Sequence, residues 1–217
     1  MVGVWCRMRP QCRPVAASIA DLAARQHGVV ARRQLLEAGV TIDQLKGLLR
    51  RGHLHPLHRG VYAVGHPRIS REGRWLAAVL ACGPGAVLSH GPAGQLLGIV
   101  ARRERFALHV SLPTRGRSGP AGILTHSPRC LDRRDITTRD RIPVTSVTRT
   151  VWDLATIFTP LATRRAFEQA ERCGLDRGPA RGAARRLAFA EGRRGDPRAL
   201  RRAVAAAGGD PEPARGD

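Results

Sequence analysis

Residues 41–64 combine the pattern of an amphipathic helix with a strand–turn–strand pattern, and this combination constrains the fold more strongly than any other feature. Thr41 and Gln44 form a capping box, in which a hydroxyl and an amide satisfy backbone groups at a helix start. The apolar positions that follow occupy one arc of the 3.6-residue wheel and are expected to face a core. These positions are Ile42, Leu45, Leu48 and Leu49, whereas Asp43, Gly47, Arg50 and Arg51 lie opposite.

A β-hairpin is predicted directly after this helix, which ends at about Arg51. Residues 54–58 and 61–64 have the composition of strands, and Arg59-Gly60 between them is a tight-turn pair. Pro56 lacks a backbone N–H, so the first strand is expected at a sheet edge or with a bulge.

Two shorter helices are predicted before this region. The first begins with a capping box at Ser18–Asp21 and ends before Gly28, and the second covers about residues 31–38 and is capped by Gly39. The residues expected on their apolar faces are Ile19, Leu22, Ala23, Leu35 and Leu36. Three short helices followed by a basic hairpin indicate a winged helix-turn-helix. In that fold the third helix enters the major groove of DNA, and the hairpin contacts a neighbouring groove or phosphates.

The charge of the chain agrees with a polyanionic partner. The 217 residues hold 37 Lys plus Arg against 17 Asp plus Glu, a formal net charge of +20, and nucleic acid is the expected partner of such a chain. Lys46 is the only lysine, and this preference for arginine is typical of a GC-rich genome, so part of the charge is expected to be solvated surface. Aromatic residues are only 4% of the chain, which favours duplex DNA over single strands, because stacking needs several exposed rings.

The expected DNA contacts lie on the second and third helices and on the hairpin. They are Arg32, Arg33, Thr41, Asp43, Gln44, Lys46, Arg50, Arg51, His53, His55, His58 and Arg59. Simple surface charge remains an alternative for the arginines, as ordinary packing or exposure does for the histidines. The hairpin histidines do not offer four good ligands, so no metal site is expected there.

The rest of the chain predicts an α+β fold with four parts: a disordered extension (1–17), the winged helix-turn-helix (18–66), a mixed α+β domain (67–175) and an Arg/Ala/Gly-rich, partly helical tail (176–217). Within 67–175, helices are predicted at about 71–82, 92–97, 147–158 and 160–173, and extended segments at 86–90, 106–112, 122–127 and 141–145. In the tail, helices are predicted near 179–190 and 197–206, with disorder from 208.

No catalytic residue, metal or cofactor is expected. A restriction-like nuclease usually places a lysine beside its acidic metal ligands, and Lys46 lies instead on the predicted DNA-reading helix. Ser89 and His90 are adjacent, so they are not expected to point at each other, and Ser89 is interpreted as a helix cap.

Two charged motifs and the cysteines are interpreted as structural. The segment Asp132–Asp135 is expected to be a solvated, salt-bridged turn, because its two carboxylates flank two arginines. Arg149 and Asp153, four apart on a helix, are expected to pair. The five cysteines form no CxxC pair, so reduced thiols in a cytoplasm are expected.

Several of these motifs together resemble the AbiEi family of antitoxins, over roughly residues 18–205. The motifs are Gly28-Val29-Val30, Leu35-Leu36, Gly39-Val40, Leu45, Gly52-His53-Leu54, His58-Arg59-Gly60-Val61-Tyr62, Ala86-Val87-Leu88-Ser89-His90, Ile142-Pro143-Val144-Thr145-Ser146-Val147-Thr148-Arg149-Thr150 and Asp153-Leu154-Ala155. The combination is similar to a large actinobacterial group of AbiEi-like proteins. Gly91-Pro92 departs from the bulkier or polar residues that relatives have after Ser-His.

The resemblance implies a cytoplasmic, non-enzymatic transcriptional regulator of a type IV toxin–antitoxin system. Such a protein binds double-stranded operator DNA, represses its own operon and antagonises a nucleotidyltransferase-like toxin without needing a stable complex. No membrane partner is implied. Many members of the group carry a C-terminal domain like very-short-patch-repair endonucleases, and this chain ends at Asp217, about where that domain begins in them. A truncated member of this fused group that binds DNA without the nuclease is one alternative, and a module that binds structured RNA through its tail is another.

Overall fold

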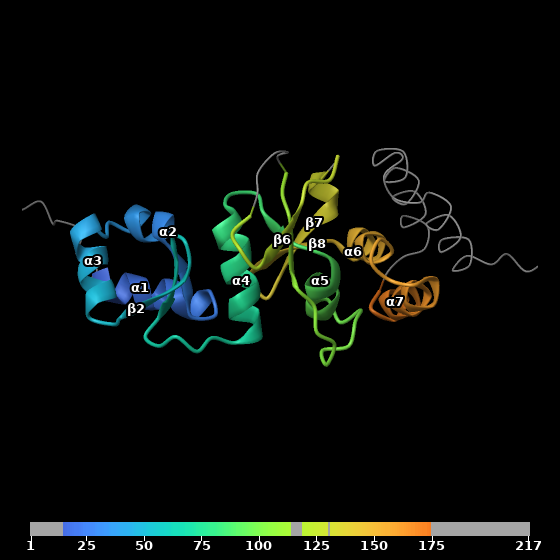
Figure 1. Ribbon diagram of the computed structural model, residues 1–217, viewed down its shortest axis with the longest axis horizontal. Helices are drawn as coiled ribbons and strands as arrows, with labels where there is room; N and C mark the ends of the chain where they lie inside the picture. Colours follow the sequence, from blue (N-terminus) through green and yellow to red (C-terminus); the bar gives the residue numbers. More distant parts are fainter. Residues whose placement is uncertain (1–14, 114–118, 130, 175–217) are drawn as a thin grey trace, which may run out of the picture. The chain divides into compact units, whose positions relative to one another are not determined.

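The structure is a computed structural model that describes residues 15–113, 119–129 and 131–174. The fold is mixed α+β with two separate sheets, which confirms the predicted fold class (Figure 1). Contacts divide the chain into two compact units, residues 1–73 and 74–217, and each is described separately below. The helices predicted in the tail lie outside the described residues.

The first unit contains three helices and a three-stranded antiparallel sheet. Its elements are α1 (Val15–Arg25), β1 (Val29–Ala31), α2 (Arg32–Glu37), α3 (Ile42–Arg50), β2 (Leu54–His58) and β3 (Val61–Val64). The strand order is β1-β3-β2, so β2 is an edge strand, and its register shifts between Pro56 and His58. The edge position and the bulge predicted from Pro56 are thus both present. This order of elements is consistent with a winged helix.

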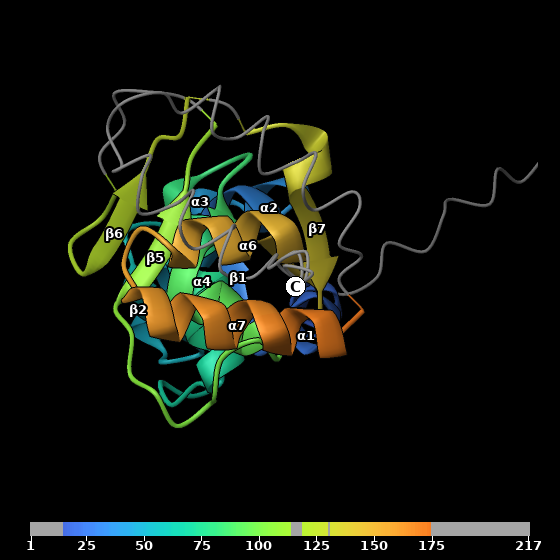
Figure 2. The same cartoon turned by 90° about the vertical axis from the view of Figure 1, so that its right-hand side faces the viewer.

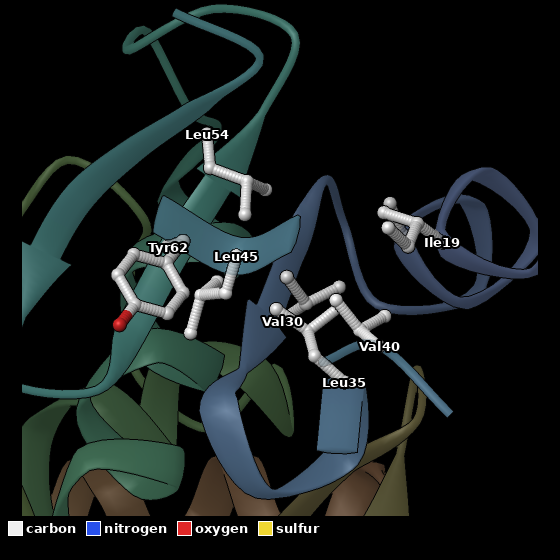
Figure 3. Packing of buried hydrophobic residues seen from close by; sticks show 8 residues of the cluster. Ile19, Val30, Leu35, Val40, Leu45, Leu54 and Tyr62 are labelled. Atoms are coloured by element: carbon white, nitrogen blue, oxygen red, sulfur yellow. The ribbon is translucent and has the colours of Figure 1, made fainter. Parts of the chain in front are cut away.

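A hydrophobic cluster holds the described part of the first unit together. Figure 3 shows Leu45 of α3 between Tyr62 of β3 and Val30 of β1, with Leu35 and Val40 beside Val30. Apolar burial stabilises by about 25 cal/mol per Å², so this cluster is what fixes α3 against the sheet. The remaining buried members are Ile19, Ala23 and Leu54, and Leu22, Leu48, Leu49 and Val64 pack around them.

Three predictions for the helices of this unit were wrong in part. Helix α1 begins at Val15, not at Ser18, because the alanines at 16 and 17 extend it with high helix propensity. Leu36 is 41% exposed, because the six-residue helix α2 buries Leu35 but not the adjacent Leu36. Ile42 is 49% exposed. Helical side chains point toward the N-terminus of their helix, so a side chain in the first turn extends beyond the part of the helix that packs on the core.

Two local features of the first unit were also not predicted. β1 is a fully buried three-residue strand, too short to show a period of two. Gly47 is buried, although it was assigned to the outer side of α3. The reason lies in Arg51, whose side chain covers it and is described below.

The second unit is built around a five-stranded mixed sheet of order β6-β5-β4-β8-β7. Its strands are β4 (Val87–Leu88), β5 (Leu108–Ser111), β6 (Ile123–His126), β7 (Ile136–Arg139) and β8 (Ile142–Thr145), with a short 3-10 helix η1 (Arg133–Asp135). β4 pairs with β8 and β5 with β6 in parallel, whereas β4 with β5 and β7 with β8 are antiparallel. Strand β7 was not predicted, since three of its four residues are polar and exposed.

Helices cover both faces of this sheet. They are α4 (Arg71–Cys82), α5 (His90–Leu96), α6 (Val147–Leu154) and α7 (Pro160–Arg172). Helix α4 and the group formed by α5, α6 and α7 lie on opposite sides of the sheet, and α7 runs beside α6 (Figures 1 and 2). Trp75, Leu76, Val79 and Leu80 of α4 are buried. A second apolar cluster, including Val100, Leu154 and Ala170, joins the segment after α5 to α6 and α7.

Candidate nucleic-acid interface

The start of α3 is held by the capping box that the sequence predicts. Gln44 N donates to Thr41 Oγ1 at 3.2 Å, and Thr41 N donates to Gln44 Oε1 at 2.8 Å. The amide oxygen of Gln44 is therefore engaged at the cap, and both residues lie at the exposed N-terminal end of the helix. In a helix that enters the major groove, residues at this end are the ones that reach base edges.

The outer side of α3 carries Asp43, Lys46 and Arg50, all of them exposed. Lys46 Nζ lies 3.8 Å from Asp43 Oδ1, with 64% and 94% of the two side chains accessible. A pair this open contributes little to stability, so both groups are available to another partner. Arg50 lies in the last turn, where its charge also suits the negative end of the helix.

Arg51 is placed differently from the other basic residues of this region. Its guanidinium folds back over Gly47, where a Cβ on the glycine would lie 3.0 Å from one of the terminal nitrogens. This contact explains why Gly47 is buried while Arg51 itself is exposed. The bare backbone at position 47 thus provides the surface on which the arginine side chain rests.

The turn of the hairpin lies beside the start of α2. Arg32 N donates to Gly60 O at 2.8 Å, and Gly60 has the left-handed φ of 75° that the turn requires. Arg59, next to Gly60, is exposed, and so is Arg32. The fold therefore brings together two arginines that are separated by 27 positions in the sequence. Arg33 is half-buried.

The three hairpin histidines have separate environments. His53 is exposed and precedes β2, while His55 Nε2 lies 3.2 Å from Gly65 O. Partial burial lowers the pKa of His58, so its imidazole is neutral at neutral pH and adds no charge to the hairpin. Among the described residues, these histidines do not form a group spaced to hold a metal ion.

Two apolar residues of α2 and α3 are exposed, although sequence reasoning assigned both to the core. Ile42 opens α3, and Leu36 lies in α2. An exposed aliphatic side chain at the start of a DNA-reading helix suits contact with a thymine methyl group. The available signal was the position of Ile42 directly after the N-cap, where a side chain leans away from the helix body.

Comparison with known families bears on this unit directly. Residues 18–65 match the family model described as "Transcriptional regulator, AbiEi antitoxin". Residues 18–65 are therefore similar to the AbiEi antitoxin family of transcriptional regulators. The match runs from the body of α1 to the end of β3 and so contains the whole candidate interface. The AbiEi family is one of regulators and not of enzymes.

A solved structure also resembles the chain at low identity. The crystal structure of the RV2827C protein from Mycobacterium tuberculosis is similar at 20% identity, over 88% of this chain and 81% of that one, with a TM-score of 0.42. No curated protein matches the chain. None of the described helices has both the length and the apolar character that a membrane span requires.

The second unit bears on two of the chemical interpretations of the sequence. Arg149 Nε donates to Asp153 Oδ1 at 2.8 Å and both side chains are buried, so the predicted structural pair is confirmed. In the segment Asp132–Asp135 the prediction of a solvated turn was wrong for Asp135, which is 2% exposed. Its carboxylate accepts from Asp132 N at 3.2 Å and caps η1.

Ser89 and His90 also depart from expectation. Ser89 occupies the N-cap position of α5 but makes no side-chain cap bond; its Oγ lies 3.0 Å from His90 Nδ1. The two side chains meet because His90 has a left-handed φ of 53°, which turns its ring back toward the serine. Of the cysteines, Cys82 is buried and Cys173 is exposed, and the other three lie outside the described residues.

Proposed function

We propose that this chain is a DNA-binding transcriptional regulator and antitoxin of a type IV toxin–antitoxin system, which represses its own operon through a winged helix. The single observation that carries the proposal is the exposed polar side of α3, set next to a basic hairpin in a unit of AbiEi type. The partners are double-stranded operator DNA and a nucleotidyltransferase-like toxin that is antagonised without a stable complex.

In this proposal α3 lies in the major groove. Gln44 and Lys46 face base edges, Ile42 contacts a thymine methyl group, and Arg50 binds a phosphate near the end of the helix. Thr41, Asp43 and Arg51 line the same groove, with Arg51 reaching DNA after leaving Gly47. A hydrophobic residue between polar ones is a normal arrangement for reading A·T pairs.

The hairpin forms the second contact. Arg59 at the turn and Arg32 beside it bind one stretch of phosphate backbone, because the hydrogen bond from Arg32 N to Gly60 O keeps their main chains together. Arg33 and the histidines at positions 53, 55 and 58 border this contact. With His58 neutral, its contribution is a hydrogen bond and not a charge.

The domain boundaries at 66/67 and 175/176 belong to the same proposal. Residues 18–66 bind the operator, and residues 67–175 supply the antitoxic function. The protein acts in the cytoplasm, where operator DNA is found.

Anisotropy titration of the full chain with a labelled duplex from the region upstream of its own gene tests the proposal. Arg50→Ala and Arg59→Ala are each expected to weaken binding about tenfold, as loss of one arginine contact to DNA does. Arg139→Ala is the matched control, since Arg139 is an exposed arginine on β7 of the second unit. Equal losses for all three variants, or no loss for the first two, would contradict the assignment of the interface.

A further inference from the structure

Three histidines from separate segments meet in the second unit, far apart in the sequence and outside the proposed DNA interface. His109 lies on β5, His126 lies on β6, and His90 follows β4 as the first residue of α5. β5 and β6 are parallel, with Ser111 paired with His126. Because alternate residues of a strand share a face, His109, Ser111 and His126 lie on the same side of the sheet.

The junction of β4 and α5 brings the third histidine to this face. Ser89 N donates to His109 O at 3.0 Å, which sets the junction beside β5. His90 then adopts its left-handed φ of 53°, a conformation that is costly for a residue with a side chain. The His90 ring stacks on His126 with a centroid distance of 3.9 Å and lies 4.9 Å from the ring of His109.

The spacing of the ring nitrogens matches what a small metal ion needs. His109 Nδ1 and His126 Nε2 are 2.9 Å apart, and one nitrogen from each of the three rings lies within 4.8 Å of the others. Ligand nitrogens around a tetrahedral Zn²⁺ ion lie about 3.3 Å apart, given Zn–N bonds of about 2.0–2.1 Å. Metal binding requires the rings to rotate about their side-chain bonds until the nitrogens converge on one ion, which replaces the hydrogen bond between His109 Nδ1 and His126 Nε2.

A hydrogen bond to a second residue fixes which nitrogen of His90 faces the cluster. Ser89 Oγ is 3.0 Å from His90 Nδ1, which leaves Nε2 as the ligand atom. Metal-binding histidines almost always engage their other ring nitrogen in this way, because the contact orients the ring. Ser89 thus orients the His90 ring for metal binding, and its hydroxyl does not cap the helix.

A further polar atom at this face of the sheet is the hydroxyl oxygen of Ser111. Ser111 is 1% exposed, and its Oγ has no hydrogen-bond partner among the described residues. Buried hydroxyls are normally hydrogen-bonded, because an unpaired buried hydroxyl destabilises the fold. A water or other ligand bound to a metal at the three histidines would supply the missing partner.

The charge around the cluster is compatible with a cation. Arg149 is near enough to lower the pKa values of His90 and His126, but its guanidinium is paired with the carboxylate of Asp153. Burial lowers the pKa of His109 to about 4, so all three imidazoles are neutral at neutral pH, which is the form that binds metals.

We propose that His90, His109 and His126 bind a divalent transition-metal ion, with Zn²⁺ the best fit, and that the fourth position is open to water. Three imidazole nitrogens with an open position are a typical Zn²⁺ donor set. The ion links β4–α5, β5 and β6 and so ties the parallel edge of the sheet to the start of α5. His126 is only half-buried and gives the ion a path to the site.

The test uses the full chain after removal of metals with a chelator, which is then dialysed away. Calorimetric titration with Zn²⁺ is expected to show one ion per chain. Co²⁺ in place of Zn²⁺ is expected to give the intense visible absorption bands of a four-coordinate site. His109→Gln and His126→Gln should each weaken Zn²⁺ binding by at least about a hundredfold, and Ser89→Ala by about tenfold, as loss of a supporting hydrogen bond does.

The matched control is His55→Gln, which removes an imidazole from the hairpin of the first unit. It should leave the stoichiometry, affinity and Co²⁺ spectrum unchanged. Far-UV circular dichroism selects variants that retain the fold, and the half-buried His126 is the safest position for this purpose. The proposal is overturned if the wild-type chain binds no Zn²⁺ at micromolar concentration, or if folded His126→Gln binds it as tightly as wild type.

Discussion

The guanidinium of Arg51 lies directly over Gly47 on α3, with a terminal nitrogen 3.0 Å from the place that a Cβ of residue 47 would occupy. Gly47 lies inside the helix and does not have a positive φ, so its backbone conformation does not require a glycine. Its role is to let a flexible arginine side chain rest against the backbone of α3.

This relationship predicts that Gly47→Ala does not harm the fold. The atom in the way is the far end of a flexible side chain, and alanine is favoured over glycine inside a helix by about 0.5–1 kcal/mol. The free energy of unfolding in urea is expected to rise by up to that amount. Gly91→Ala in α5 is the contrast and is expected to be destabilising, because its Cβ would overlap the ring of Phe106. A destabilising Gly47→Ala would show that Arg51 is held in place and is not free to move.

The capping box of α3 predicts a loss of stability for Thr41→Ala. The substitution removes the acceptor for Gln44 N at the helix start, which typically costs about 1 kcal/mol. Thr41→Ser keeps the hydroxyl and is expected to retain most of the stability. Urea unfolding followed by circular dichroism measures both variants, and equal midpoints for alanine and serine would argue against a capping role.

Two ion pairs of the same geometry should differ greatly in their effect on stability. Arg149 and Asp153 are 2.8 Å apart and about 5% exposed, whereas Arg164 and Glu168 are 2.9 Å apart and about half exposed. Asp153→Ala leaves a buried guanidinium without its carboxylate and is expected to cost about 3–5 kcal/mol. Glu168→Ala should cost less than about 1 kcal/mol. Thermal unfolding of the two variants checks the difference, and similar losses would contradict the role of burial.

DNA binding through phosphate contacts predicts a steep dependence on salt. If about six phosphates are neutralised, the affinity for the operator should fall roughly 10³-fold between about 50 and 200 mM salt. Arg59→Ala, which removes one proposed phosphate contact, should reduce the slope of log affinity against log salt by about one. Anisotropy titrations at several salt concentrations measure both quantities, and a salt-independent affinity would exclude this mode of binding.

The buried imidazoles predict acid sensitivity of the metal-free protein. Burial, followed by the charges of His126, His109 and Arg149, lowers the pKa of His90 from 6.5 to about 2. Burial and His126 lower the pKa of His109 to about 4. Below pH 6.5 the unfolded chain therefore binds more protons at these histidines than the folded chain does. The stability that the neutral histidines contribute is complete above pH 6.5 and decreases as the pH falls toward the folded pKa values.

Urea unfolding in the presence of a chelator, at pH values from about 7.5 to 5, measures this effect above the range in which most carboxylates titrate. The buried histidines are therefore expected to contribute most of the slope. His109→Gln should make the dependence on pH shallower than that of the wild-type chain. A wild-type stability that is constant over this range would show that the three rings titrate normally.

The sequence by itself determined the local elements that depend on neighbouring residues. The capping box at Thr41, the hairpin turn at Arg59-Gly60 and the edge position required by Pro56 were all predicted, because caps, turns and proline act within a few residues. The buried pair of Arg149 and Asp153 was predicted for the same reason, since four residues make one turn of a helix.

Only the tertiary structure decided which residues of distant segments share a surface. The hydrogen bond between Arg32 and Gly60 and the meeting of His90, His109 and His126 depend on strand order and on the parallel register of β5 with β6. No pattern along the chain encodes that register, because parallel strands pair through a long connection and not through a turn. The exposure of Ile42 was likewise decided by where the core ends, which helical periodicity does not show.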